Sequence, residues 1–142
     1  MGAGDSRPRR SGLPASGQHL LRSDVLAAEL VANAGIGPGD LVLEIGAGRG
    51  RLTLPLADAA RRVVAVEIDA AFVSGLRQLF SGREHVQVVP SDFLKLPSPR
   101  EPFRAFGNVP FALTTPILRR LLDDPTSGLS RADLILQYEA AR

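Results

Sequence analysis

Three glycines and one carboxylate are spaced as in a nucleotide-binding site. Gly46, Gly48 and Gly50 follow the apolar run of residues 41–45. Glycine adopts backbone conformations closed to other residues and lets a ligand approach the main chain. Glu67 ends a second apolar run about 20 residues later, where such folds place the acid that binds a ribose diol. The spacing predicts a site for a ribose-containing ligand, the alternative being that Glu67 is an ordinary strand-end carboxylate.

Two further groups follow later predicted strands. Asp92 comes two residues after Pro90, at which a third strand is expected to end. The tetrapeptide Asn108-Val109-Pro110-Phe111 directly follows a fourth strand. Open α/β sheets bind ligands at the carboxyl ends of their strands, so both groups should lie at the same edge as Glu67. The alternative interpretation of the tetrapeptide is a strand-exit turn with a core aromatic residue.

The glycine pattern departs from the dinucleotide fingerprint G-x-G-x-x-G. Arg51 occupies its sixth position, and the third glycine comes one residue early. The closing glycine that packs helix on strand is therefore missing, which argues against a nicotinamide or flavin cofactor.

Apolar runs alternate with helical patterns along the chain. This alternation predicts a three-layer α/β/α fold with a mostly parallel sheet. The expected strands cover residues 41–45, 63–69, 86–89, 103–107 and 134–138. The first helix is expected to have Ser23 or Asp24 as its N-cap, and the next two cover residues 51–60 and 70–80, with Asp69 available as a cap. Thr114 or Thr115 is expected to cap the last helix. The predicted packing residues are Val25, Leu26, Leu30 and Val31, then Phe72, Val73, Leu76, Leu79 and Phe80, then Ile117, Leu118, Leu121 and Leu122, with Arg119 and Arg120 outward.

Composition excludes several classes of protein. The 142 residues fit one domain, and no apolar run is long enough for a membrane span. The chain has no cysteine, which excludes disulfides and cysteine-based metal sites and fits a cytoplasmic protein. The pI of 9.9 comes mostly from arginine, which favours a nucleic-acid partner, although a coding bias would also produce it. Residues 1–17 should form a flexible basic arm in which Arg7, Arg9 and Arg10 contact phosphates or are merely solvated.

The motifs in this order resemble a known enzyme family. GQHLL, LEIGAGRG, VEID, SDF, GNVPF and LQYEAAR are similar to motifs of the rRNA adenine N6-methyltransferases, which use S-adenosylmethionine. The resemblance runs from about residue 17 to residue 142. It is greatest to the Erm group, which methylates 23S rRNA and confers macrolide, lincosamide and streptogramin B resistance. The resemblance implies a Rossmann-like class I methyltransferase fold.

The family's cofactor contacts can be carried over to this sequence. The resemblance implies that the turn with Gly46 and Gly48 passes under the methionine part of S-adenosylmethionine. It implies that Glu67 binds the ribose hydroxyls and that Asp92 binds the adenine amino group. His19 and Leu21 would line the same site. His19 stands where family members commonly have asparagine.

The resemblance also assigns a role to each residue of the tetrapeptide. Asn108 would contact both the cofactor and the target adenine. Its amide oxygen and the Val109 carbonyl would accept the amino hydrogens, and Pro110 would stiffen the turn that presents them. Phe111, which replaces a more frequent tyrosine, would stack on an adenine taken out of its helix. This chemistry requires no metal.

The family pattern continues beyond the end of this sequence. Relatives have two more strands and a helical C-terminal domain that helps to hold RNA, so we expect residues 18–142 to form a methyltransferase domain without its C-terminal part. We expect a monomer, with pairing through the edge of the fifth strand as the alternative. Two other functions remain open: a small-subunit rRNA adenine dimethyltransferase, and a catalytically weak module that binds cofactor or RNA.

Overall fold

The computed structural model of the chain describes residues 23–137. The arm expected over residues 1–17, the candidate residues His19 and Leu21, and Tyr138 lie outside this range. The elements in chain order are α1 (Asp24–Ala34), β1 (Leu41–Ile45), α2 (Thr53–Ala59), β2 (Arg62–Glu67), α3 (Ala70–Leu79), β3 (Val86–Pro90), the 3₁₀ turn η2 (Phe93–Lys95), β4 (Phe103–Pro110), the 3₁₀ turn η3 (Phe111–Leu113), α4 (Thr114–Leu122) and β5 (Leu129–Gln137).

The strands form one parallel sheet in the order β3-β2-β1-β4-β5. The chain winds outward from β1 to β3 and then returns to the other side of β1 as β4. In open α/β sheets such a reversal leaves a crevice at the carboxyl ends of the two central strands. The crevice here is bordered by the glycine turn, which follows β1, and by the tetrapeptide 108–111, whose first three residues are the end of β4.

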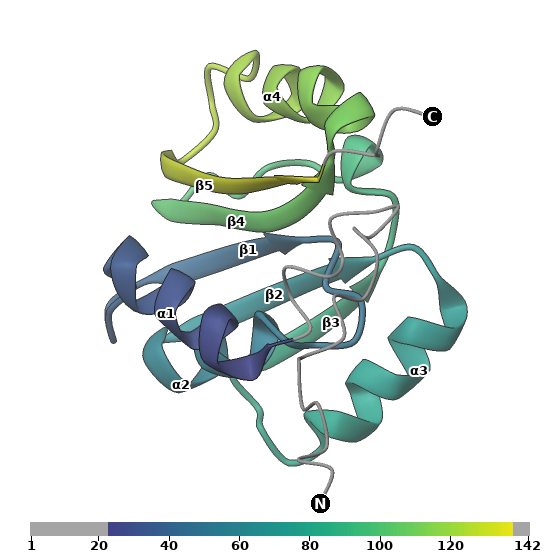
Figure 1. Cartoon of the computed structure of the whole chain (residues 1–142). Coiled ribbons are helices and arrows are strands. Elements are labelled where there is room, and N and C mark those ends of the chain that lie inside the picture. The colour runs from purple at the N-terminus through teal and green to yellow at the C-terminus, as the bar shows by residue number, and fades with distance from the viewer. Residues whose placement is uncertain (1–22, 138–142) are drawn as a thin grey trace, which may run out of the picture.

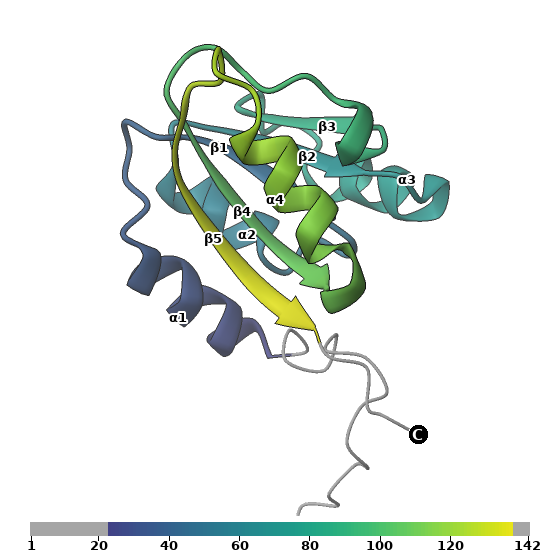
Figure 2. The ribbon, with the colours of Figure 1, turned by 90° about the horizontal axis from the view of Figure 1, so that it is seen from above.

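Helices cover both faces of the sheet (Figure 1). On one face α1, α2 and α3 bury a core that includes Val31, Leu56 and Leu76. On the other face Ile117 and Leu121 of α4 pack with side chains of β1 and β4. Figure 2 shows α4 returning alongside β4 and β5. The predicted three-layer α/β/α arrangement with a parallel sheet is confirmed.

β1 and β3 match the sequence-based expectation to within one residue, whereas β2 ends at Glu67, two residues before the expected end at Asp69. β1 is buried at every position, as its mostly apolar sequence predicted. β4 continues to Pro110, because β5 pairs with it through Pro110 and Gln137. β5 begins at Leu129, five residues earlier than expected, because the exposed edge tolerates polar side chains such as Ser130 and Arg131. Dimer formation through this edge of the described sheet stays a prediction.

The helix faces were predicted less accurately than the strands. Helix α2 begins at Thr53 and keeps Pro55 in its first turn, as required. Ser23 caps α1 by accepting a hydrogen bond from the Leu26 amide, but neither Thr114 nor Thr115 caps α4. Four residues predicted to pack against the core are exposed instead because they lie off the buried stripe of their helix: Val25, Leu79, Leu118 and Leu122.

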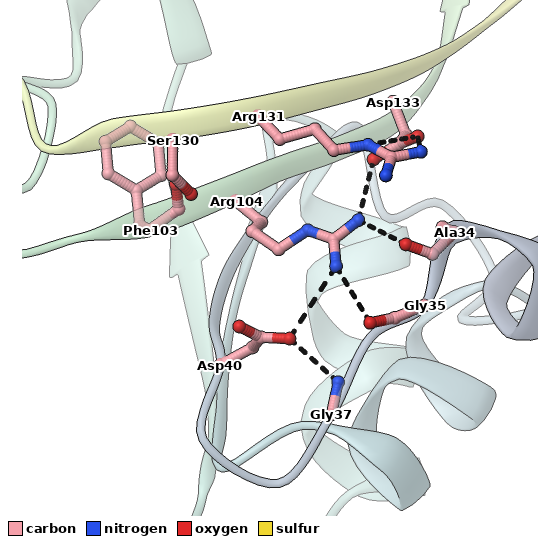
Figure 3. Close-up of polar contacts among 9 residues, drawn as sticks. All are labelled: Ala34, Gly35, Gly37, Asp40, Phe103, Arg104, Ser130, Arg131 and Asp133. Atoms are coloured by element: carbon pink, nitrogen blue, oxygen red, sulfur yellow. Dashed lines mark hydrogen bonds and ion pairs between the residues drawn. The ribbon is translucent and has the colours of Figure 1, made fainter.

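A buried arginine that the sequence did not single out joins four segments (Figure 3). Arg104 of β4 is only 9% exposed. Its guanidinium donates to the carbonyls of Ala34 and Gly35 at the end of α1, and to Asp133 Oδ2 of β5 at 3.1 Å. It also forms an ion pair with Asp40, which lies just before β1. Arg104 thus supplies donors to the unpaired carbonyls at a helix end and fixes α1 to the middle of the sheet.

Candidate functional site

The glycine turn begins where β1 ends and is fastened to the end of β2. Gly46, Gly48 and Gly50 all have positive φ values, of 71°, 55° and 86°. The amides of Gly46 and Ala47 donate to the Val66 carbonyl at 2.9 and 3.1 Å. The turn therefore presents bare backbone at the carboxyl edge of the sheet, as its sequence predicted.

Gly50 has a packing role. A Cβ atom at this position would lie 3.0 Å from Leu79 Cδ2 and 3.2 Å from Leu76 Cδ2. The close approach of α3 to the glycine turn thus depends on Gly50, although the fingerprint's sixth-position glycine is absent.

Glu67 ends β2 and is 8% exposed. Its Oε1 accepts from the Gly48 amide at 2.8 Å, and its Oε2 accepts from the Asp69 amide at 2.9 Å. Each carboxylate oxygen can accept more than one hydrogen bond, so both can still receive a ligand hydroxyl. Asp69 caps α3 by accepting from the Ala71 and Phe72 amides, as its position suggested.

Asp92 follows β3 and caps the 3₁₀ turn η2. Its Oδ1 accepts from the Leu94 amide at 3.0 Å. This contact turns the carboxylate toward the same edge of the sheet as Glu67, and both carboxylates line one pocket.

Asn108 and Phe111 lie on the other side of the crevice, at the end of β4. The Asn108 side-chain oxygen Oδ1 is buried and has no hydrogen-bond partner within residues 23–137. An unsatisfied buried acceptor is costly, and at a site edge it indicates a ligand donor. Phe111 is 50% exposed in η3.

One pocket of about 140 Å³ gathers most of the predicted site residues. Gly46, Glu67, Asp92 and the segment 108–110 line it, whereas Gly48 and Phe111 do not. The volume is below the several hundred Å³ typical of a complete small-molecule site, so the pocket accounts for one part of a cofactor. The pocket also contains lining residues that sequence reasoning missed: Ile45, Val66, Ile68, Ser91, Phe93, Leu94, Leu113 and Ile117.

Ile68 is the clearest of the missed residues. Its side chain is apolar but 71% exposed, and it lies between Glu67 and Asp69 in the sequence. An exposed apolar side chain at the rim of a polar site suits the flat face of a base. Its signal in the sequence was an apolar residue placed between two acids just after a strand.

Glu44 is a second carboxyl group that sequence reasoning missed. It lies in β1, is 1% exposed, and accepts a hydrogen bond from the Thr53 hydroxyl at the start of α2. Burial raises the pKa of Glu44 from 4.5 to about 7; the Thr53 hydrogen bond lowers it and the Glu67 charge raises it further. Glu44 thus connects β1 and α2 on either side of the glycine turn.

Because the folded protein holds the Glu44 proton more tightly than the unfolded chain, we expect stability to fall as pH rises. The stability that the protonated Glu44 contributes is fully present below pH 4.5 and is lost as pH rises through about 7. Between pH 5.5 and 7.5, this group should lower the free energy of unfolding by about 2 kcal/mol. Urea denaturation of the parent and Glu44→Gln at both pH values measures it. The free energy of unfolding of Glu44→Gln should lack this part of the pH dependence. The same pH dependence in the variant and the parent would contradict its assignment to the Glu44 carboxyl group.

Neither a metal site nor a membrane span is found in the described part of the chain. Residues 23–137 contain no group of three or more acidic, histidine or cysteine side chains that could hold a metal ion. No helix among these residues is long and apolar enough to cross a membrane.

Sequence comparisons identify relatives over nearly the whole chain. The family model described as ribosomal RNA adenine dimethylase matches residues 12–142. An rRNA adenine N-6-methyltransferase of Bacillus licheniformis is 39% identical over 127 residues, which cover 89% of this chain and 44% of the relative. A ribosomal RNA small subunit methyltransferase A of a Synechococcus strain is 40% identical over 135 residues, which cover 89% of this chain and 49% of the relative. The chain thus spans about half the length of the curated relatives it matches.

Solved structures agree with these sequence matches. The crystal structure of the 23S rRNA methyltransferase ErmE has a TM-score of 0.74 and 36% identity, covering 81% of this chain and 46% of that one. A dimethyladenosine transferase from Plasmodium falciparum has a TM-score of 0.71 and 28% identity, covering 83% of this chain and 43% of that one. The predicted Rossmann-like methyltransferase fold is confirmed, and the chain belongs to the ribosomal RNA adenine dimethylase family.

Proposed function

We propose that this chain binds S-adenosylmethionine and transfers its methyl group to the N6 amino group of an adenine in ribosomal RNA. The observation that carries the proposal is the buried, unpartnered Asn108 Oδ1 at the edge of the pocket. Family membership supports it, since relatives that match most of this chain are named rRNA adenine N-6-methyltransferase and ribosomal RNA small subunit methyltransferase A.

The residues around the pocket fit the cofactor. Glu67 offers two carboxylate oxygens to the ribose hydroxyls, and the backbone of Gly46 and Gly48 offers a surface without side chains to the methionine part. Asp92 keeps one carboxylate oxygen for the adenine amino group, and Ile68 covers the base. The resemblance to the family also assigns His19 and Leu21 to this site, and both lie outside the described residues.

The bound cofactor supplies an activated methyl group on a sulfonium, so the chain's own residues need only position the target and adjust its charge. The lone pair of an adenine N6 is delocalised into the ring. Asn108 Oδ1 and the Val109 carbonyl accept the two amino hydrogens and draw electron density onto the nitrogen. Pro110 restricts the turn that presents these oxygens, and Phe111 stacks on the extruded base.

We propose 23S rRNA as the substrate, with macrolide-type resistance as the consequence and the cytoplasm as the location. The higher TM-score and identity to ErmE than to the Plasmodium dimethyladenosine transferase favour this choice. A small-subunit target is the second candidate, because relatives with that name match equally well in sequence. A module that binds cofactor or RNA without catalysis is the third, because the chain spans about half of its relatives.

Transfer of tritiated methyl groups to isolated ribosomal RNAs tests the proposal. We expect label in N6-methylated adenine of 23S rRNA and none in small-subunit RNA, with Asn108→Ala as the inactive control. Label confined to small-subunit RNA would select the second candidate. Cofactor binding without label in either RNA would select the third.

A further inference from the structure

Arg120 joins two segments that line the pocket. The sequence predicted an outward side chain, but the structure places Arg120 half-buried on α4. Its Nε and Nη2 atoms donate to the Leu96 carbonyl at 3.0 and 2.6 Å. One backbone oxygen thus accepts two charge-assisted hydrogen bonds, which are stronger than neutral ones.

Leu96 ends the short turn that begins at Asp92. The Asp92 carboxylate accepts from the Leu94 amide, and the Leu96 amide donates to the Phe93 carbonyl at 3.1 Å. A single 3₁₀ turn has few hydrogen bonds of its own and weak intrinsic stability. The position of the Asp92 carboxylate therefore depends on what holds the end of the turn.

Helix α4, on the other side of the pocket, fixes the end of this turn at Leu96. It follows directly from Asn108–Leu113, and its Ile117 shares a core with Phe93 of the turn. Between residues 91–97 and 108–122, the Arg120 contacts are the only side-chain hydrogen bonds that the structure shows in its described part. The guanidinium fixes the Asp92 turn to the helix that begins at the tetrapeptide.

We propose that Arg120 is a positioning residue for recognition of the cofactor's adenine, acting through the Asp92 turn. This inference rests on the proposed function, in which Asp92 accepts a hydrogen bond from the adenine amino group. Arg120 touches neither cofactor nor target. Arg120 fixes the position of the Asp92 carboxylate relative to the adenine of the cofactor. It does so from α4, the helix that follows the tetrapeptide at which the target adenine is proposed to bind.

The test compares two ligands that differ only at the base. S-adenosylhomocysteine has the amino group that Asp92 recognises, and S-inosylhomocysteine has an oxygen there. Titration calorimetry of the parent should show on the order of tenfold preference for the adenosyl ligand, the scale of one hydrogen bond to a charged acceptor. Arg120→Met should bring the two affinities to within about threefold, as should Asp92→Asn. Arg120→Lys, which keeps a donor, should retain part of the preference.

Arg119→Met is the matched control, because Arg119 is an exposed arginine on the same helix, and it should keep the parent's preference. A purely structural role for Arg120 would lower the melting temperature of Arg120→Met and leave the preference intact, which would overturn the inference. A parent that binds both ligands equally would overturn the role of Asp92. A parent that binds neither would overturn the proposed cofactor itself.

Discussion

Replacing Asn108 with alanine should reduce methyl transfer by about 100- to 1,000-fold, the scale seen when one aligned catalytic hydrogen-bond partner is removed. The same change should leave the free energy of unfolding unchanged or raise it. Asn108 Oδ1 is buried without a partner in the described chain, so the folded protein loses an unfavourable desolvated acceptor when it is removed. Loss of activity without loss of stability distinguishes a residue kept for chemistry from one kept for folding.

Thr114→Val provides the matched control for this prediction. Among residues 23–137, Thr114 Oγ1 at the start of α4 is the other side-chain oxygen that is buried without a hydrogen-bond partner. Valine has nearly the same shape, so this variant should gain stability in a similar way and keep its activity. Single-turnover methyl transfer and urea denaturation of both variants give the two readouts. Equal losses of activity in Asn108→Ala and Thr114→Val would indicate that both changes disturb the structure near the end of β4, and not that the Asn108 amide takes part in catalysis.

The central strands were predictable because their physical cause is local. Four of the five residues 41–45 are apolar, and a strand covered on both faces buries all of them. Glu67 and Asp92 could be placed at one edge for a similar reason, since parallel strands present their carboxyl ends together. The predicted ends of the strands therefore placed both carboxylates correctly, and both line the pocket.

The parts that sequence reasoning missed depend on contacts between distant segments. The polar start of β5 pairs with β4, which no local pattern indicates. Glu44 is an acid within an apolar strand, and its hydroxyl partner Thr53 is known only once α2 is placed. Arg120 has an exposed position by helical periodicity, yet its length lets it reach the Leu96 carbonyl.

Replacing Glu67 with alanine should weaken binding of S-adenosylhomocysteine by about 100-fold or more, because two charge-assisted hydrogen bonds to the ribose hydroxyls are lost. The substitution also leaves the amides of Gly48 and Asp69 without their acceptor. The glycine turn should then become less ordered, and the melting temperature should fall. Titration calorimetry on samples shown to be folded by circular dichroism measures the change in affinity.

Asp69→Ala separates these two effects of Glu67, because Asp69 stabilises the same region without facing the pocket. Its carboxylate caps α3, and its loss should cost about 1 kcal/mol of stability. If Glu67 binds the ribose, Asp69→Ala should lower the melting temperature while keeping nearly the parent's affinity. If both variants lose affinity in proportion to stability, Glu67 supports only the turn. A loss of affinity in Glu67→Ala but not in Asp69→Ala means that the Glu67 carboxylate both holds the glycine turn and binds the ribose. The two backbone hydrogen bonds then orient the carboxylate oxygens before the ribose binds.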